Sequence, residues 1–224
     1  MSWHEWIRER EIEPSLYAAN FAILGEQIET LCRAGCRIFH FDVGDGHFVE
    51  PVTMGPIVLQ SISPIVHRHG GAIDVHLMVE QPARYFAPVA AAGGDSATFH
   101  FEAVDDVAAT VRAAHEHQLQ AGVAFNPESA PQDVARVAGD ADLVLCMSIH
   151  PGYSGQSFRE ETFARVAALR AALPQDVLIQ VDGGVGPGNI ERLLDEGVRL
   201  LVAGAAIFDR DDIAAAYGEL ASAA

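Results

Sequence analysis

Residues 37–48 read RIFHFDVGDGHF, an apolar run that ends in a glycine-containing turn. The β-branched and aromatic residues of 37–43 predict a buried strand. Two polar side chains, His40 and Asp42, interrupt this run, and a strand places residues two positions apart on the same face. Because an unpaired buried carboxylate is very costly, a metal ion, a substrate or a partner side chain is expected beside this pair.

The segment 37–43 is one of eight short apolar runs, and an amphipathic segment follows each of them. The predicted strands are 12–16, 37–43, 72–78, 97–102, 120–125, 143–149, 177–183 and 199–204, and the predicted helices are 20–34, 55–62, 82–92, 104–117, 131–138, 158–172, 187–196 and 211–222. Eight strand–helix pairs in 224 residues predict an α/β fold with a single (β/α)8 TIM barrel. Residues 1–224 would form this one barrel domain, with 1–11 as an N-terminal extension. An open doubly wound sheet is the alternative.

Composition narrows the class of partner. The formal net charge is −17, which argues against nucleic acid or an anionic membrane, because phosphate backbones are bound by basic surfaces. A small phosphorylated ligand is still compatible with this charge, since backbone N–H groups at helix N-termini can hold a phosphate. All 14 cationic residues are arginine, so chemistry that needs a lysine Schiff base is excluded.

The ends and the cysteines of the chain point to the cytoplasm. The N-terminal residues MSWHEWIRERE are charged, unlike a signal peptide, and no apolar run has the length of a membrane span. Cys32, Cys36 and Cys146 do not form a disulfide framework. The sequence is compatible with either a monomer or a homo-oligomer.

Polar residues gather near the C-terminal ends of the predicted strands, where the active sites of such barrels lie. They are Ser15, His40, Asp42, His76, Met147 with Ser148, and Asp182. Two imidazoles and two carboxylates, from His40, Asp42, His76 and Asp182, predict a site for one divalent metal ion. Mixed nitrogen and oxygen ligands suit Zn²⁺, Fe²⁺, Mn²⁺ or Co²⁺, of which Zn²⁺ is favoured here.

Three glycine-containing stretches follow the later strands. They read HPGYSGQSF (150–158), DGGVGPGNI (182–190) and VAGAAIF (202–208). Glycines allow close backbone approach, and loops after the seventh and eighth strands often bind phosphate in these barrels. A ligand with a phosphate at one end and metal-binding oxygens at the other is a sugar phosphate.

The two carboxylates suggest a reaction. Asp42 and Asp182 come from different strands, so one could remove a proton from carbon while the other delivers a proton to the opposite face. A metal would stabilise the enediolate formed in between. Such a two-base scheme produces an epimer.

Several stretches together resemble the ribulose-phosphate 3-epimerase family. They are IEPSL followed by NFAILGEQI, then HFDVGDGHFVEPVTMGP, DVHLMVEQPARY, FHFEA, GVAFNP, MSIHPGYSGQSF, QVDGGVGPGNI and VAGAAIF, in order from about residue 12 to 208. The resemblance implies an isomerase of the pentose phosphate pathway, a (β/α)8 barrel that interconverts D-ribulose 5-phosphate and D-xylulose 5-phosphate with one divalent metal.

The resemblance also implies roles for individual residues. His40, Asp42, His76 and Asp182 would be metal ligands, with Asp42 as proton acceptor and Asp182 as proton donor. The residues implied to contact substrate are Ser15, His76, Met147, Gly152, Tyr153, Ser154, Gly155, Gly183, Gly184, Gly204 and Ala205. On this basis His100 and Glu102 would lie behind the metal ligands.

Four positions depart from the family pattern. Gly44 replaces a methionine and is expected to leave room for water or a larger substrate. His150 and Ser154 alter the phosphate loop, and Ala205 removes a serine hydroxyl, at a cost of about 1–2 kcal/mol for one hydrogen bond. An epimerase for a six-carbon ketose phosphate, a non-catalytic phospho-ligand-binding barrel and a metal-dependent hydrolase are therefore the alternatives.

Overall fold

The computed structural model describes residues 3–7, 9–153 and 155–224. Its strands, in chain order, are β1 (Glu11–Pro14), β2 (Ile38–Gly44), β3 (Ala72–Met78), β4 (Ser96–His100), β5 (Gln120–Phe125), β6 (Leu143–Met147), β7 (Leu178–Asp182) and β8 (Leu200–Ala203). All of them pair in parallel in one sheet, and β1 pairs with β8 at Glu11↔Leu200. A parallel bridge between Ser15 and His40 joins the end of β1 to β2. The predicted (β/α)8 barrel is confirmed.

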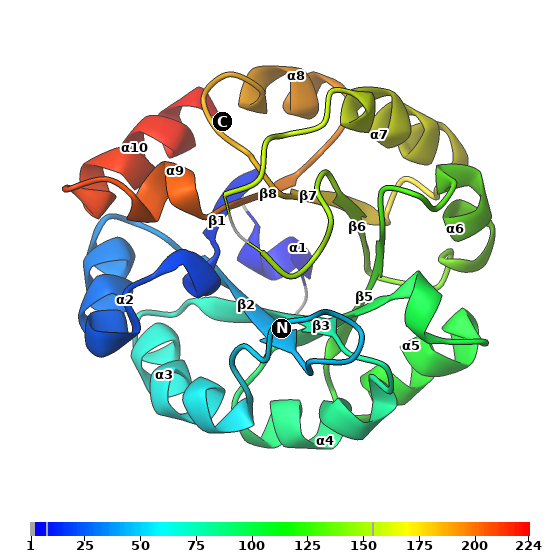
Figure 1. Ribbon diagram of the computed structural model, residues 1–224, viewed down its shortest axis with the longest axis horizontal. Helices are drawn as coiled ribbons and strands as arrows, with labels where there is room; N and C mark the ends of the chain where they lie inside the picture. Colours follow the sequence, from blue (N-terminus) through cyan, green and yellow to red (C-terminus); the bar gives the residue numbers. More distant parts are fainter. Residues whose placement is uncertain (1–2, 8, 154) are drawn as a thin grey trace.

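Helices surround this barrel as an outer ring (Figure 1). They are α2 (Leu24–Arg33), α3 (Pro56–Arg68), α4 (Ala83–Ala91), α5 (Val107–Glu116), α6 (Pro131–Val137), α7 (Glu161–Ala172), α8 (Ile190–Asp195), α9 (Ala205–Phe208) and α10 (Ile213–Ala223). Every strand from β2 to β8 is almost entirely buried, as expected when helices cover the outside and side chains fill the inside. In the described ranges, no helix has both the length and the apolar character needed to cross a bilayer.

The predicted strand ends were too late in several places. Ser15 lies just beyond β1, and Phe101–Ala103 forms a 3₁₀ turn where the strand was expected to continue. Helix α3 runs past the predicted end at residue 62 although Pro64 lies inside it. The apolar stripe continues through Ile62 and Val66, and their burial outweighs the backbone hydrogen bond that Pro64 removes.

The N-terminal segment, predicted as an extension, contains the short helix α1 (Trp3–Trp6). Trp3 and Trp6 pack edge to face, with ring centroids 5.0 Å apart. They belong to a buried cluster with the first residues of several strands, among them Ile38 and Leu143. Seen along the barrel in Figure 1, α1 lies across its centre. The tryptophans therefore close the N-terminal end of the barrel, opposite the strand ends that were expected to hold the site.

Replacing Trp3 with Ala is expected to lower the free energy of unfolding by about 3 kcal/mol, because it removes a buried indole and leaves a cavity. Chemical denaturation of wild type and variant measures this change. Ile57→Ala is the control, since Ile57 is 78% exposed and surface changes usually stay within about 0.5 kcal/mol. A Trp3→Ala loss no larger than that of the control would show that α1 does not contribute to barrel stability.

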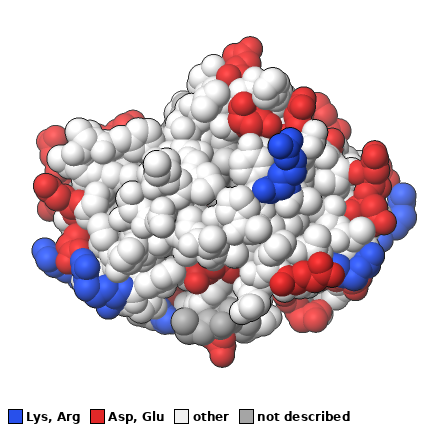
Figure 2. All heavy atoms as spheres, turned by 90° about the horizontal axis from the view of Figure 1, so that it is seen from below, with Lys and Arg blue, Asp and Glu red and all other residues white. Residues whose placement is uncertain are grey.

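Figure 2 shows the charge on one side of the molecule. Most acidic side chains and arginines lie toward the edges of this face, blue atoms also lie to the upper right of its centre, and uncharged side chains occupy most of the rest. Arginines do not gather into a broad basic patch on this face. The view agrees with the strongly acidic composition.

Candidate active site

Four predicted side chains meet at the C-terminal ends of β2, β3 and β7. His40, Asp42, His76 and Asp182 each offer one ligand atom, and these atoms lie within 4.8 Å of one another. Strand register explains the meeting, because Asp42 is paired with His76 across β2 and β3. His40 shares the inward face of β2 with Asp42, as the spacing of two predicts. This cluster could bind a metal ion.

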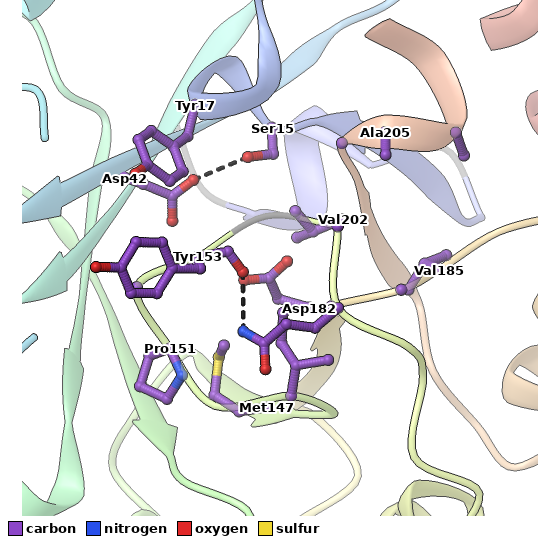
Figure 3. Close-up of a pocket in the computed structure, with 18 of the residues that line it drawn as sticks. Ser15, Tyr17, Asp42, Met147, Pro151, Tyr153, Asp182, Val185, Val202 and Ala205 are labelled. Atoms are coloured by element: carbon purple, nitrogen blue, oxygen red, sulfur yellow. Dashed lines mark hydrogen bonds between the residues drawn. The ribbon is translucent and has the colours of Figure 1, made fainter. Parts of the chain in front are cut away.

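Asp42 lies at the centre of these contacts. Its Oδ1 is 3.3 Å from His40 Nε2 and 3.1 Å from His76 Nδ1. Its Oδ2 accepts a hydrogen bond of 2.9 Å from the hydroxyl of Ser15, which Figure 3 shows as a dashed line. The backbone bridge between Ser15 and His40 places that hydroxyl beside Asp42. Asp42 is thus held from three sides by β1, β2 and β3.

The pKa values of the two carboxyl groups of the cluster are shifted in opposite directions. Burial by itself would raise the pKa of Asp42, but attraction by His40 and the contact with His76 outweigh burial and hold the pKa below its ordinary value. Burial raises the pKa of Asp182 to about 7, and repulsion by Asp42 and Asp74 adds to the rise, against attraction by His40. Such a separation is typical of carboxyl pairs in which one acts as base and the other as acid.

A second layer of polar side chains lies inside the barrel, beneath the cluster, and was not predicted. His40 Nδ1 donates to Asp74 Oδ2 at 2.9 Å. The Gln180 amide donates to Asp74 Oδ2 at 2.8 Å and to Glu13 Oε2 at 2.6 Å. Burial, which dominates, raises the pKa of Glu13 to about 8. These residues therefore fix the ring of His40 from below.

The sequence contained a signal for this layer. Glu13, Asp74 and Gln180 each precede a predicted site residue by two positions, on β1, β3 and β7 respectively. The spacing rule that pairs His40 with Asp42 applies equally to these three. The three residues lie one pair before the C-terminal strand ends, where the site was expected, and the inner layer was therefore not predicted.

A cavity of about 300 Å³ opens above the cluster (Figure 3). The predicted residues that line it are Ser15, Asp42, Met147, Gly152, Tyr153, Gly155, Asp182, Gly183, Gly184, Gly204 and Ala205. Ser154 lies outside the described residues. His76 was expected to contact the substrate but does not line the cavity, because its ring is fully buried between Asp42 and His100.

Other lining residues were not predicted as ligand contacts. They are Tyr17, Met78, Ile149, Pro151, Gln156, Val185, Gly186, Val202 and Ala206. Tyr17 and Tyr153 lie near Asp42 in Figure 3, where they form the aromatic part of the wall. Tyr153 also donates from its hydroxyl to Glu50 at 3.2 Å, which links two loops at the barrel mouth. The described lining residues include no arginine.

The glycine loops after β7 and β8 leave backbone exposed to the cavity. Gly183 and Gly184 have φ of 109° and 62°, a region that side chains disfavour. A Cβ on Gly184 would lie 2.6 Å from the backbone nitrogen of Phe158. Gly184 therefore has no room for a side chain and lines the cavity with its backbone.

Two departures from the family pattern lie away from the cavity. A Cβ on Gly44 would lie 2.8 Å from the Pro51 carbonyl oxygen and 3.0 Å from Val49. The expectation that Gly44 leaves room is therefore wrong, because the following loop fills that space. His150 pairs with Glu128 at 3.3 Å, both 61% exposed, and does not line the cavity.

Comparisons with known proteins identify the family of the chain. Residues 11–208 match the Ribulose-phosphate 3 epimerase family. The chain is 35% identical over 214 residues to the ribulose-phosphate 3-epimerase of Bacillus subtilis (strain 168), covering 94% of this chain and 97% of that protein. It is 38% identical over 216 residues to the enzyme of that name from Escherichia coli (strain K12), covering 94% of each.

A solved structure shares the fold at low identity. Orotidine 5'-phosphate decarboxylase from Pyrococcus horikoshii OT3 superimposes with a TM-score of 0.68 at 15% identity, over 95% of this chain and 98% of that chain. At this identity the likeness concerns the barrel alone. The match over residues 11–208 and the curated relatives identify the chain as a member of the ribulose-phosphate 3-epimerase family.

Proposed function

We propose that this protein is an isomerase that interconverts D-ribulose 5-phosphate and D-xylulose 5-phosphate by inversion at carbon 3. The observation that carries the proposal is the placement of two carboxylates, Asp42 from β2 and Asp182 from β7, on the wall of one cavity. Figure 3 draws both side chains pointing into it. Inversion by proton transfer needs two such groups, and family membership supports this reaction.

We propose one divalent metal ion as the cofactor, held by His40, Asp42, His76 and Asp182. A buried nitrogen supports the fit: His40 Nε2 lies 3.3 Å from Asp42 Oδ1 but forms no hydrogen bond with it or with any other described residue. Because Asp74 holds the Nδ1 of the same ring, Nε2 is the nitrogen free to bind an ion. The donor set suits Zn²⁺, Fe²⁺, Mn²⁺ or Co²⁺, and we favour Zn²⁺. A bound ion would supply the Lewis acidity that makes the carbon-bound hydrogen easier to remove.

The protein's own groups then transfer the proton. Asp42, as the carboxylate, takes the hydrogen from carbon 3 of D-ribulose 5-phosphate. Asp182, as the carboxylic acid, delivers its proton to the opposite face of that carbon. In the reverse direction the two exchange roles. Ser15 orients Asp42 through the hydrogen bond to Oδ2.

The rest of the cavity suits a phosphorylated chain. The backbone around Gly183, Gly184, Gly204 and Ala205 would bind the phosphate through N–H groups, as anion sites without basic side chains do. Met147 forms an apolar wall. Gly152, Tyr153 and Gly155 would cover the ligand from the loop after β6. The filled space around Gly44 removes the reason to prefer a six-carbon substrate.

The test is an assay with D-ribulose 5-phosphate in D₂O, followed by coupled detection of D-xylulose 5-phosphate. We expect formation of the epimer together with deuterium at carbon 3. Six-carbon ketose phosphates run in parallel measure the substrate preference. A protein that binds the phosphate without incorporating deuterium would be a binding barrel, and the proposed function would be wrong.

Metal removal is expected to lower kcat by more than about 100-fold, since electrostatic stabilisation of a developing negative charge is worth that much or more. The measurement compares activity before and after dialysis against a chelator, with metal content determined for each sample. Zn²⁺, Fe²⁺, Mn²⁺ and Co²⁺ are then added back separately, and the metal that restores the highest activity is the best candidate for the cofactor. Full activity in protein shown to be metal-free would contradict the metal centre.

A further inference from the structure

A chain of side chains leads from His76 to the barrel rim. His76 Nε2 lies 2.9 Å from His100 Nε2, and His100 Nδ1 lies 3.3 Å from Glu102 Oε2. Both rings are fully buried, while the Glu102 side chain is 24% exposed. Phe48 also packs against His100, with ring centroids 4.7 Å apart. These contacts leave His100 one orientation, with each nitrogen facing a fixed partner.

The row of side chains from Asp42 through His76 and His100 to Glu102 has too few N–H hydrogens for all of its contacts. Between Asp42 and Glu102, two imidazoles make three contacts: Asp42 to His76, His76 to His100, and His100 to Glu102. Two neutral imidazoles carry only two N–H hydrogens, so one of the three contacts has none. A metal ion bound by His76 Nδ1 would take the place of the missing hydrogen. His76 Nε2–H would then donate to His100 Nε2, and His100 Nδ1–H would donate to Glu102.

Glu102, at the outer end of this row of side chains, determines which groups donate hydrogen bonds and which accept them. Glu102 Oε1 accepts from the backbone N–H of Asn126 at 2.8 Å and from the hydroxyl of Ser129. Arg165 holds the loop that carries them, donating to the Asn126 carbonyl at 2.7 Å and the Ser129 carbonyl at 3.3 Å. A backbone N–H can only donate, so Oε1 must be an acceptor. The other oxygen, an acceptor too in the ionised side chain, requires Nδ1–H on His100.

We propose that Glu102 is a positioning residue which, through His100, sets the tautomer of His76 so that its Nδ1 lone pair faces the metal site. This inference rests on the proposed function, because it assumes that the site binds a divalent metal. It assigns a role to the loop after β5, whose Asn126 and Ser129 contact Glu102. Outer partners of metal-bound histidines typically contribute about 10- to 100-fold to metal affinity.

The isosteric variant Glu102→Gln gives the sharpest test. The Asn126 N–H keeps the amide oxygen of the new side chain, so the amide NH₂ faces His100 Nδ1. His100 Nδ1 would then accept from this amide, so the hydrogen of His100 would be on Nε2. A His76 that binds metal through Nδ1 also carries its hydrogen on Nε2, which faces the same position. Two N–H groups would face each other across 2.9 Å. Glu102→Ala removes the acceptor for His100 Nδ1–H but places no donor there. The more conservative Glu102→Gln should therefore lower Zn²⁺ affinity more than Glu102→Ala.

The experiment measures Zn²⁺ affinity by competition with a chelator for wild type, Glu102→Gln and Glu102→Ala. We expect losses of about 100-fold for Gln and about 10-fold for Ala. Nitrogen-15 NMR of the Zn²⁺-loaded proteins reports the His100 tautomer, which should be Nδ1–H in wild type and Nε2–H in Glu102→Gln. Thermal unfolding confirms that the variants are folded.

Asp142→Asn is the matched control. Asp142 Oδ2 also joins a backbone N–H, that of Ala121 at 2.7 Å, to a histidine, His115 at 2.8 Å, but it lies at the N-terminal end of the strands. Its Zn²⁺ affinity should equal that of wild type. Two results with a Zn²⁺-binding wild type would overturn the positioning role while the proposed function stands. One is that Glu102→Gln binds Zn²⁺ as tightly as wild type, and the other is that it binds Zn²⁺ more tightly than Glu102→Ala. If wild type does not bind Zn²⁺, the proposed metal centre fails and the positioning role fails with it.

Discussion

Asp42→Asn is expected to lower kcat for conversion of D-ribulose 5-phosphate by about 10³-fold or more, because the amide cannot accept the proton from carbon 3. The isosteric amide keeps the size of the side chain, so the barrel should remain folded. The variant should also fail to incorporate deuterium from D₂O into D-ribulose 5-phosphate. These measurements are made at saturating metal with metal content determined, since Asp42 is also a proposed ligand.

D-xylulose 5-phosphate, as a second substrate, distinguishes loss of the Asp42 carboxylate from disruption of the whole site. In the proposed mechanism Asp182 removes the proton from D-xylulose 5-phosphate, so Asp42→Asn should still exchange that hydrogen slowly with solvent without forming the epimer. Asp95→Asn is the control, because Asp95 pairs with His67 at 2.9 Å and accepts from the Ile73 N–H at 2.8 Å, away from the cavity. Near-wild-type turnover by Asp42→Asn would refute the two-carboxylate mechanism.

Asp182→Asn should give the mirror image of this result. Epimerisation is expected to fall by a similar factor of about 10³, because no acid delivers a proton to the second face. Asp42 is intact in this variant, so D-ribulose 5-phosphate should still exchange its carbon 3 hydrogen with D₂O while D-xylulose 5-phosphate should not. Mass spectrometry of both recovered substrates measures this asymmetry.

The pair of variants makes the assignment of the two acids testable. Exchange from the opposite substrate in each variant would mean that the roles of Asp42 and Asp182 are reversed. Loss of exchange from both substrates in metal-loaded Asp182→Asn would mean that Asp182 also acts in the first proton transfer. Retention of epimerisation would remove Asp182 from the mechanism.

The cluster of His40, Asp42, His76 and Asp182 could be predicted from the sequence because strand geometry is regular. A spacing of two places His40 and Asp42 on one face, and parallel strands in a barrel bring their C-terminal ends together. No contact needed to be known for either step. The same rule applied one pair earlier along each strand would have found Glu13, Asp74 and Gln180.

Other features depended on contacts that no local pattern encodes. The closure of the barrel by Trp3 and Trp6 involves the starts of strands far along the chain. The space beside Gly44 appeared open from its missing side chain, but Val49 and Pro51 return to fill it. His76 was expected to contact the substrate, and its fully buried ring does not line the cavity. Each outcome depends on where a loop or helix returns in space.

The sequence alone determined the barrel, the order of its elements and the four side chains that meet at one end, because hydrophobic periodicity and strand alternation are local properties. Only the tertiary structure decided which nitrogen of each histidine faces Asp42, which residues hold those rings, and how much of the cavity wall is bare backbone. Hydrogen bonds and close packing depend on distances of a few ångströms between segments far apart in the chain. Spacing along the sequence does not specify those distances.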